Sequence, residues 1–285
     1  YIFLIMSPLL FSYETLVHAV AGATGSVVGM AAFYPLDTLR SRQQIEDSTK
    51  LRGSTWELLV LIAKEEGLES LYCGLYPVLQ SLSVSNFVYF YTFHALKRSS
   101  IGSTAIKDLL FGILAGSLNV LLTSPLWVVN TRIKLGKNNY KSLSGGLIEL
   151  FKKEGLRGLW SGTVPSLLLV SNPAIQFMVY ESLKRNFIAM NRFNTYSAFM
   201  IGAIAKAIAT TLTYPLQLIQ SRLRAGTSLK PLYKDIKSNP KIIFRGLEAK
   251  IMQTVMTAAL MFLIYEKVVR LVIRNIHGLR KIIFR

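Results

Sequence analysis

Three copies of one eight-residue pattern lie ninety residues apart in this chain. Each copy begins with Pro-Leu and carries Arg at its eighth position, and the copies occupy residues 35–42, 125–132 and 215–222. A glycine stands thirteen residues before each proline, at Gly22, Gly112 and Gly202. Two landmarks that keep one period through three copies indicate an internal triplication, so we interpret the chain as three similar structural units.

Six stretches of the chain carry almost no charge, and basic connections separate them. Their lengths, roughly 14–21 residues, approach what a tilted helix needs to cross a bilayer. They are residues 16–34, 78–93, 109–129, 164–180, 198–214 and 252–265. We therefore predict an all-α membrane protein with six transmembrane helices, two per unit. A soluble solenoid is the alternative, but solenoid helices are amphipathic, whereas these stretches are apolar nearly all round.

Positive charge dominates the polar part of the sequence, with a formal net charge of +18. In a membrane protein this excess favours an anionic partner, which can be a lipid headgroup, nucleic acid or an anionic solute. The three histidines do not cluster, and no nucleophile motif, Gly-rich nucleotide loop or metal-ligand spacing is present. We therefore expect neither an enzyme nor a metal site nor a resident cofactor.

Each unit is expected to contain a helix, a basic connection, a short amphipathic helix and a second helix. Residues 55–64 and 143–153 have the pattern of helices that lie on a membrane surface. An acid-Gly pair and an aromatic-x-Gly motif follow at 66–74 and 154–162, whereas the third unit keeps only 244–246. From Arg222 to Gly246 the chain spans 24 residues, against 32 and 30 in the other units. We expect the third surface helix to be shortened or missing.

The predicted organisation places three repeats between two terminal segments. Residues 1–12 form an apolar extension, which is compatible with a cleaved signal peptide or an incomplete amino end. The repeats are expected at 13–100, 101–192 and 193–275, the last with its shortened loop, and a basic tail is expected at 276–285.

The tripled pattern Pro-x-acid-x-x-base-x-base, followed by acid-Gly and aromatic-x-Gly, resembles the mitochondrial carrier family over residues 13–275. Segments 85–97, 125–132, 172–184 and 202–217 resemble its peroxisomal branch, which carries coenzyme A, FAD, NAD and adenine nucleotides. The resemblance implies six tilted helices with pseudo-threefold symmetry around a central water-filled cavity. Two gates would open that cavity alternately to either side.

The resemblance also implies a transporter that exchanges anionic cofactors and nucleotides (coenzyme A, FAD, NAD, AMP, ADP and ATP) across the peroxisomal membrane. These molecules would be cargo. Other expected partners are membrane lipids and, as a candidate, the peroxisomal membrane import machinery. Nucleic acid is not expected, and we expect a monomer to function. The alternatives are a mitochondrial inner-membrane carrier of another anionic metabolite, a proton or anion leak, and a nonfunctional relative.

One implied gate lies near the prolines of the odd-numbered helices, where the acid position of each unit meets the base position of the next. In this sequence the resulting partners are Asp37 with Asn130, Trp127 with Gln220, and Gln217 with Arg40. None of these combinations is an acid with a base. We therefore expect this odd-helix gate to close through hydrogen bonds and packing. The alternative for Trp127 and Gln217 is that they merely face lipid or neighbouring helices.

The second implied gate lies at the far ends of the even-numbered helices. There Glu266 would pair with Lys97 and His94 with Lys184, while Glu181 would face the sixth helix near Arg270. This even-helix gate has more charged positions than the odd-helix gate, so we expect it to be the stronger of the two.

Lys206 is the most informative candidate for substrate binding, because it lies nine residues before Pro215 within an otherwise uncharged helix. A cation at that depth costs at least about 2.5–3.5 kcal/mol unless water or an anion reaches it. We predict that Lys206 binds a substrate phosphate; snorkelling to an interface or internal pairing is the alternative. The family's contact points fall seven residues after each motif glycine. Together with two further cavity candidates they are Ser81, Leu169, Gln253, Asn119 and Lys250, for which ordinary helix packing is equally open.

Overall fold

The computed structural model describes residues 25, 27–45, 53–99, 104–136, 142–190, 194–227, 229–260, 264 and 267. These residues are predominantly helical, and no strand occurs among them. Apart from its three repeat units, the chain divides into two compact parts. The smaller is formed by 1–35 with 252–285, and the larger, called the larger unit below, by 36–251. The larger unit contains the cavity and the odd-helix contacts described below. Residues 16–24 of the first predicted stretch lie outside the described residues.

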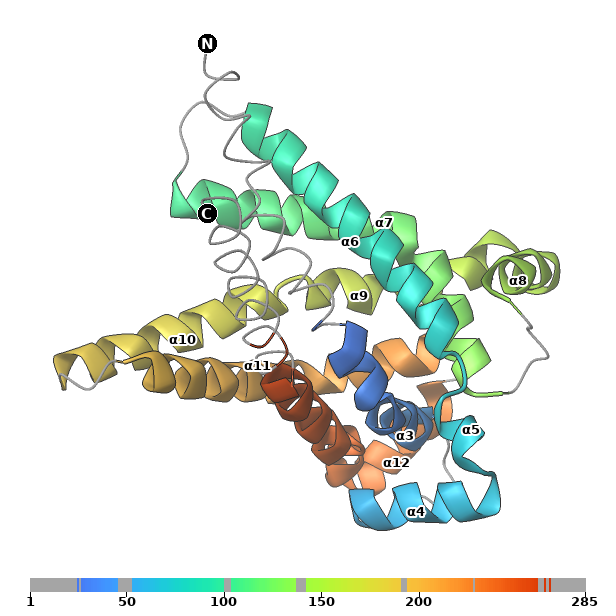
Figure 1. Cartoon of the computed structure of the whole chain (residues 1–285). Coiled ribbons are helices and arrows are strands. Elements are labelled where there is room, and N and C mark those ends of the chain that lie inside the picture. The colour runs from blue at the N-terminus through green and yellow to red at the C-terminus, as the bar shows by residue number, and fades with distance from the viewer. Residues whose placement is uncertain are drawn as a thin grey trace, which may run out of the picture. The chain divides into compact units, whose positions relative to one another are not determined.

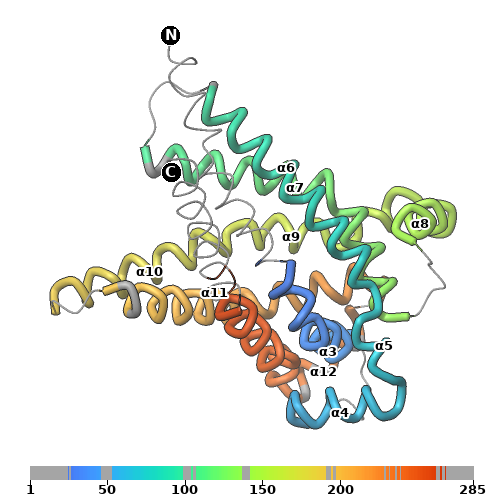
Figure 2. The backbone as a smooth tube through the Cα atoms, viewed as in Figure 1, coloured from blue at the N-terminus to red at the C-terminus, as the bar shows by residue number. Residues whose placement is uncertain are grey.

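Four long apolar segments build the larger unit. Helix α6 (Leu75–Ser99) packs along α7 (Ala105–Lys134), and α10 (Asn172–Ala189) packs along α11 (Thr195–Arg224), as Figures 1 and 2 show. Helix α9 (Thr163–Leu169) precedes α10. Within the described residues, 107–134 and 197–224 are long and apolar enough to cross a membrane. The pair 143–159 and 163–189, bent by 55°, is a third candidate. The predicted transmembrane helices at 109–129 and 198–214 are thereby confirmed as candidate spans. Residues 78–93 are helical within α6 but are not among these candidates, and the predicted stretch 164–180 is divided between α9 and α10.

Helices α7 and α11 begin with side-chain caps, which supply partners for backbone N–H groups that the first turn leaves free. Asn194 accepts from the Ser197 N–H at 2.8 Å, and the Ser197 hydroxyl accepts from the Asn194 N–H at 2.7 Å, which completes a capping box. Thr104 caps α7 in the equivalent place. Both helices carry the motif proline inside them, at Pro125 and Pro215.

The aromatic-x-Gly motif forms the same turn in all three units. Gly74, Gly162 and Gly246 have φ angles of 79°, 80° and 83°, a left-handed backbone that favours glycine. At Gly162, an added Cβ would also lie 3.1 Å from the backbone oxygen of Gln220. The repeat read from the sequence is therefore a repeat of backbone geometry.

Short helices follow each odd-numbered helix. In the first unit the odd-numbered helix ends with α3 (Tyr34–Ile45), and the short helices after it are α4 (Thr55–Glu65) and α5 (Leu68–Leu71). The second unit has α8 (Leu143–Leu159), interrupted by non-helical Gly155. The third has α12 (Leu229–Ser238) and a 3-10 helix, η2 (Pro240–Phe244). The third surface helix is present with 10 residues against 11 in α4, so the shortening removes mainly the acid-Gly turn.

The motif arginines bind the turns that follow them. Arg42 donates to both carboxylate oxygens of Glu66 at 2.7 Å, and Arg132 makes the equivalent bidentate pair with Glu154. Two small apolar cores lie beside these pairs. They consist of Leu39, Leu58, Ile62, Leu71 and Ala249 in one case, and of Val128, Val129, Ile133, Leu150 and Leu159 in the other.

Contacts among α3, α7 and α11 join the three units in a closed ring. Asp37 of α3 pairs with Lys134 of α7. Arg132 of α7 donates to the backbone oxygen of Arg224 in α11 at 3.1 Å. Arg222 of α11 returns to α3 through a 2.8 Å bond to the backbone oxygen of Gln44. Because α11 contacts α3 as well as α7, these three helices form a closed ring within residues 36–251, which a row of repeats would not form.

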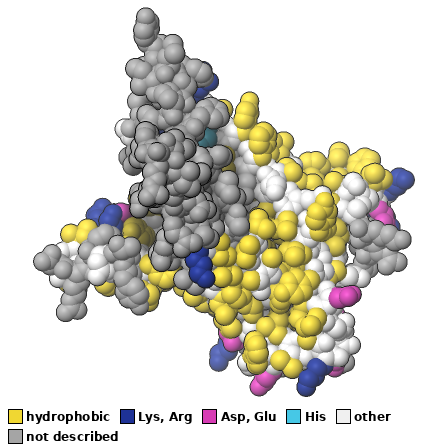
Figure 3. All heavy atoms as spheres, viewed as in Figure 1, with side chains coloured by type: hydrophobic (Ala, Val, Ile, Leu, Met, Phe, Trp, Pro, Cys, Tyr) yellow, Lys and Arg dark blue, Asp and Glu magenta, His cyan; other side chains and the backbone are white. Residues whose placement is uncertain are grey.

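Exposed leucines run along one face of α7. Leu110, Leu114, Leu118 and Leu121 recur at helical spacing and are between 42% and 56% exposed. Hydrophobic side chains also cover much of the face of the molecule seen in Figure 3, with charged side chains towards its margins. An apolar surface of this extent is typical of a protein that faces lipid.

Candidate functional site

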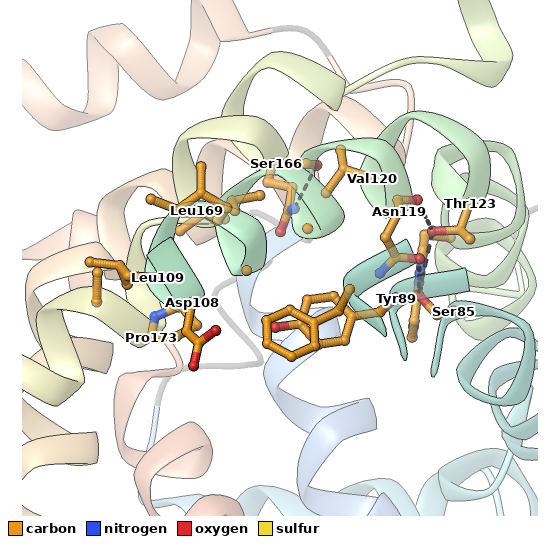
Figure 4. Close-up of a pocket in the computed structure, with 18 of the residues that line it drawn as sticks. Ser85, Tyr89, Asp108, Leu109, Asn119, Val120, Thr123, Ser166, Leu169 and Pro173 are labelled. Atoms are coloured by element: carbon orange, nitrogen blue, oxygen red, sulfur yellow. Dashed lines mark hydrogen bonds between the residues drawn. The ribbon is translucent and has the colours of Figure 1, made fainter. Parts of the chain in front are cut away.

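A cavity of about 420 Å³ lies within the larger unit, on the side of α7 away from its exposed leucines. Helices α6, α7, α9, α10 and α11 all contribute to its wall (Figure 4). Its volume is in the range of small-molecule binding sites. The wall is largely apolar and aromatic, and its members include Tyr89, Phe93, Gly112, Gly116, Trp127, Leu169, Val170 and Pro173.

A polar group interrupts this apolar wall between α6 and α7. The Ser85 hydroxyl donates to the Asn119 amide oxygen at 3.1 Å and lies 3.4 Å from the Thr123 hydroxyl (Figure 4). Asn119 and Leu169, both predicted to contact substrate, line the cavity. An amide and two hydroxyls in an apolar wall can orient a ligand through its polar edge.

Arg224, which our reading of the sequence missed, lines the cavity together with Gln220 and Ser166. Gln220 donates to the Ser166 hydroxyl at 2.7 Å, and Arg224 donates to the same oxygen at 3.1 Å. Arg224 lies four residues after Gln220, which places both on one face of α11. This spacing could have identified Arg224 from the sequence, because Gln220 was already a candidate residue of the odd-helix gate. Trp127, the expected partner of Gln220, lines the same cavity.

Ser81 does not line the cavity, although it was predicted to contact substrate. It is fully buried, and its hydroxyl accepts a 2.6 Å hydrogen bond from the Asn130 amide. Asn130 was expected to meet Asp37. The expected pairing of Asn130 with Asp37 is therefore corrected. Helices α6 and α7 pack side by side, and this packing places the Asn130 amide against Ser81.

The odd-helix gate contains an ion pair that the mapped positions did not predict. Arg40 donates to the Gln217 side chain at 3.0 Å, as the mapping expected. Asp37, however, binds Lys134, and Arg40 approaches the same carboxylate to 3.6 Å. The expectation of a gate without ionic contacts is thus wrong. Lys134 lies one helical turn after Asn130 and supplies the missing base from the same face of α7.

Cations outnumber acids around this gate. Lys250 lies within electrostatic range of Arg40, Lys134 and Lys206, with Asp37 as the nearby acid. Lys206 is partly buried, and no carboxylate in the described residues lies within ion-pair distance of it. The arrangement has more positive than negative charge in a partly buried place, which favours an anion.

The predicted residues of the even-helix gate have local partners in this conformation. Lys97 pairs with Asp108 of α7 at 2.9 Å, and Lys184 pairs with Glu181 of its own helix at 3.2 Å. His94 packs edge-on against Phe93 of its own helix. Glu266 and Arg270 lie outside the described residues. Gln253 is buried in the smaller compact unit.

No group of three or more potential metal ligands occurs in the part of the chain that the structure describes. The charged residues in the cavity wall are Arg224 and Asp108, and Asp108 is paired with Lys97.

Comparison with known proteins gives three consecutive matches to one family model, described as mitochondrial carrier protein, at residues 11–104, 101–191 and 191–276. The chain is 49% identical to peroxisomal membrane protein PMP34 of Mus musculus, over 90% of this chain and 93% of that protein. It is 30% identical to a peroxisomal nicotinamide adenine dinucleotide carrier of Arabidopsis thaliana (90% and 96%). It is 32% identical to peroxisomal adenine nucleotide carrier 1 of Glycine max (90% and 91%).

Proposed function

Because the chain belongs to the mitochondrial carrier protein family, we propose that it exchanges anionic, adenine-containing cofactors and nucleotides across the peroxisomal membrane. Relatives named as peroxisomal carriers of NAD and of adenine nucleotides support both the cargo and the location. The expected cargo is coenzyme A, FAD, NAD, AMP, ADP or ATP. The protein acts as a transporter, and these molecules pass through it without being held as cofactors.

The excess of cations at the odd-helix gate is the observation that carries this proposal. Lys206 and Lys250 lie in a partly buried region where the nearby acid, Asp37, is already paired with Lys134. An arriving phosphate would find more positive than negative charge there. Charge-assisted hydrogen bonds to a phosphate are roughly twice as strong as neutral ones, so the same contact gives affinity and selects anions.

The cavity supports a cargo that also has a flat, partly apolar portion. Tyr89 and Trp127 provide aromatic surface, and Asn119 with Ser85 provides hydrogen-bonding groups in the same wall. A small dicarboxylate would leave this apolar wall in contact with water. A ring with a polar edge can fill it and pair with the amide.

The contacts at the two gates support alternating access. The odd-helix gate is closed by Asp37–Lys134 and Arg40–Gln217, whereas Lys97 and Lys184 of the opposite gate are held by local partners. In our proposal, a phosphate bound at Lys206 and Lys250 adds negative charge near Asp37. This charge competes with Asp37 for the surrounding cations, weakens the Asp37–Lys134 ion pair and lets the gate open. A ligand shifts such an equilibrium only by its difference in affinity for the two states, so exchange depends on the cargo.

The test is transport by the purified full chain in liposomes preloaded with coenzyme A. External labelled ATP, AMP, NAD, FAD and a small dicarboxylate are offered separately. Uptake of the adenine-containing compounds that depends on internal coenzyme A supports the proposal. Uptake of the dicarboxylate alone contradicts the cargo, and current without any counter-substrate identifies a leak. Imaging of the tagged protein with peroxisomal and mitochondrial markers tests the location.

A further inference from the structure

Pro125 removes one backbone hydrogen bond from the middle of α7. Proline has no N–H, so the carbonyl four residues earlier loses its helical partner. In α7 that carbonyl belongs to Leu121, on the face with the exposed leucines. A carbonyl without a hydrogen bond is strongly unfavourable in hydrocarbon, and a transmembrane helix keeps such a proline where a neighbouring group supplies the donor.

The indole of Trp160 supplies that donor. Its Nε1–H donates to the Leu121 carbonyl oxygen at 2.9 Å, from the aromatic-x-Gly turn between α8 and α9. Three residues later the Thr163 hydroxyl donates to the hydroxyl of Ser124 at 3.1 Å. The turn at residues 160–163 therefore binds α7 at two points. Trp160 binds the Leu121 carbonyl, which has lost its helical partner to Pro125, and Thr163 binds Ser124, the residue just before the proline.

We propose that Trp160 is a positioning residue of the second unit: its indole N–H replaces the donor that Pro125 removes and so fixes the direction of the following segment of α7. That segment carries Trp127, which lines the cavity, and Lys134, which pairs with Asp37 at the predicted odd-helix gate. The inference rests on the proposed function, because the segment that Trp160 aligns is the gate of a transporter.

The third unit links its helix and turn differently from the second. Phe244 occupies the position of Trp160 and has no hydrogen-bond donor. There Tyr214, just before Pro215, donates from the helix to the backbone oxygen of Arg245 in the turn at 2.8 Å. The link between helix and turn is thus present in both units but runs in opposite directions.

A double-mutant cycle of Trp160→Phe and Pro125→Ala tests the inference. The Pro125→Ala substitution restores the backbone N–H, so the indole becomes dispensable for the Leu121 carbonyl. In the unmodified chain, Trp160→Phe should lower the unfolding temperature in detergent by roughly 2–4 °C. It should lower the maximal exchange rate about two- to tenfold, with an unchanged half-saturating concentration, because the cavity cations are untouched. In the Pro125→Ala background both effects should largely disappear. Trp56→Phe, at an exposed tryptophan of α4, is the matched control.

Equal effects of Trp160→Phe in both backgrounds would overturn the inference, since the indole would then act by packing alone. A second variant avoids any change of helix shape: 3-benzothienylalanine at position 160 keeps the size of the indole but replaces its N–H by sulfur. It should reproduce the loss in the unmodified chain, and an unchanged unfolding temperature and rate would also overturn the inference. Because unfolding temperature needs no cargo, a failed transport assay with a positive thermal cycle would refute the proposed cargo alone.

Discussion

Lys134 of α7 donates to the carboxylate of Asp37 in α3, 97 residues away, at the position of the predicted odd-helix gate. Both side chains are buried. The mapped base position on α7 holds Asn130, which instead donates to Ser81. The positive charge that pairs with Asp37 is thus carried by Lys134, one helical turn after the mapped position. The first and second units are in contact through this pair.

Removal of Lys134 should therefore disable the gate more than removal of Asn130. Leaving a buried charge without a partner costs about 3–5 kcal/mol, and Arg40, 3.6 Å from the same carboxylate, offsets part of that cost for Asp37. We expect Lys134→Gln to reduce exchange in liposomes severely, and Asn130→Lys added to Lys134→Gln to restore part of it from the earlier turn. Initial rates of counter-substrate-dependent uptake measure this. If Lys134→Gln transported like the unmodified chain, the ion pair would have no part in the gate.

The features that could be predicted from the sequence are those that local pattern determines. Hydrophobic length identified α6, α7 and α11, and the tripled motif identified three similar units; their common axis was what the family resemblance implied. The left-handed turns at Gly74, Gly162 and Gly246 follow from the same motif, since a glycine kept at one register in three copies indicates a backbone that other residues strain.

The partners of individual side chains could not be predicted in the same way. Ser81 and Asn130 were assigned to different levels of the cavity, yet they share a 2.6 Å hydrogen bond. The contact depends on the axial offset between α6 and α7. Packing along the whole length of both helices determines that offset. Lys134 was missed because a motif specifies positions, whereas a lysine side chain can reach across a full turn.

Lys206 should determine affinity for the cargo. Loss of a hydrogen bond to a charged group costs about 1.5–3 kcal/mol, which corresponds to roughly a 10- to 150-fold weaker interaction. We expect Lys206→Ala to raise the half-saturating concentration of adenine nucleotides accordingly and Lys206→Arg to recover most of the affinity. Lys153→Ala, at an exposed lysine of α8 paired with Glu149, is the control and should change nothing. Normal apparent affinity in Lys206→Ala would refute phosphate binding by Lys206.

Gly116 of α7 and Gly202 of α11 should respond oppositely to alanine. A Cβ on Gly116 would lie 2.8 Å from Val170 Cγ1, whereas a Cβ on Gly202 would meet no described atom within 4 Å. Overpacking costs about 1–3 kcal/mol, so Gly116→Ala should lower the unfolding temperature and Val170→Ala should relieve that loss. Gly202→Ala should be neutral or gain up to about 1 kcal/mol from helix propensity. Thermal unfolding in detergent compares them, and equal losses at both positions would contradict the packing difference.

The bidentate pair between Arg132 and Glu154 should stabilise the second unit. Arg132 is buried, and besides binding Glu154 it donates to the backbone of Arg224, so it joins the surface helix to the ring. Glu154→Gln removes the charge and one acceptor, and we expect a loss of about 1.5–3 kcal/mol in the free energy of unfolding. Glu149→Gln on the same helix, in an exposed pair with Lys153, should cost less than about 1 kcal/mol. Unfolding of both variants in denaturant, monitored by circular dichroism, measures the difference, and equal costs would show that burial of Arg132 adds nothing to the pair.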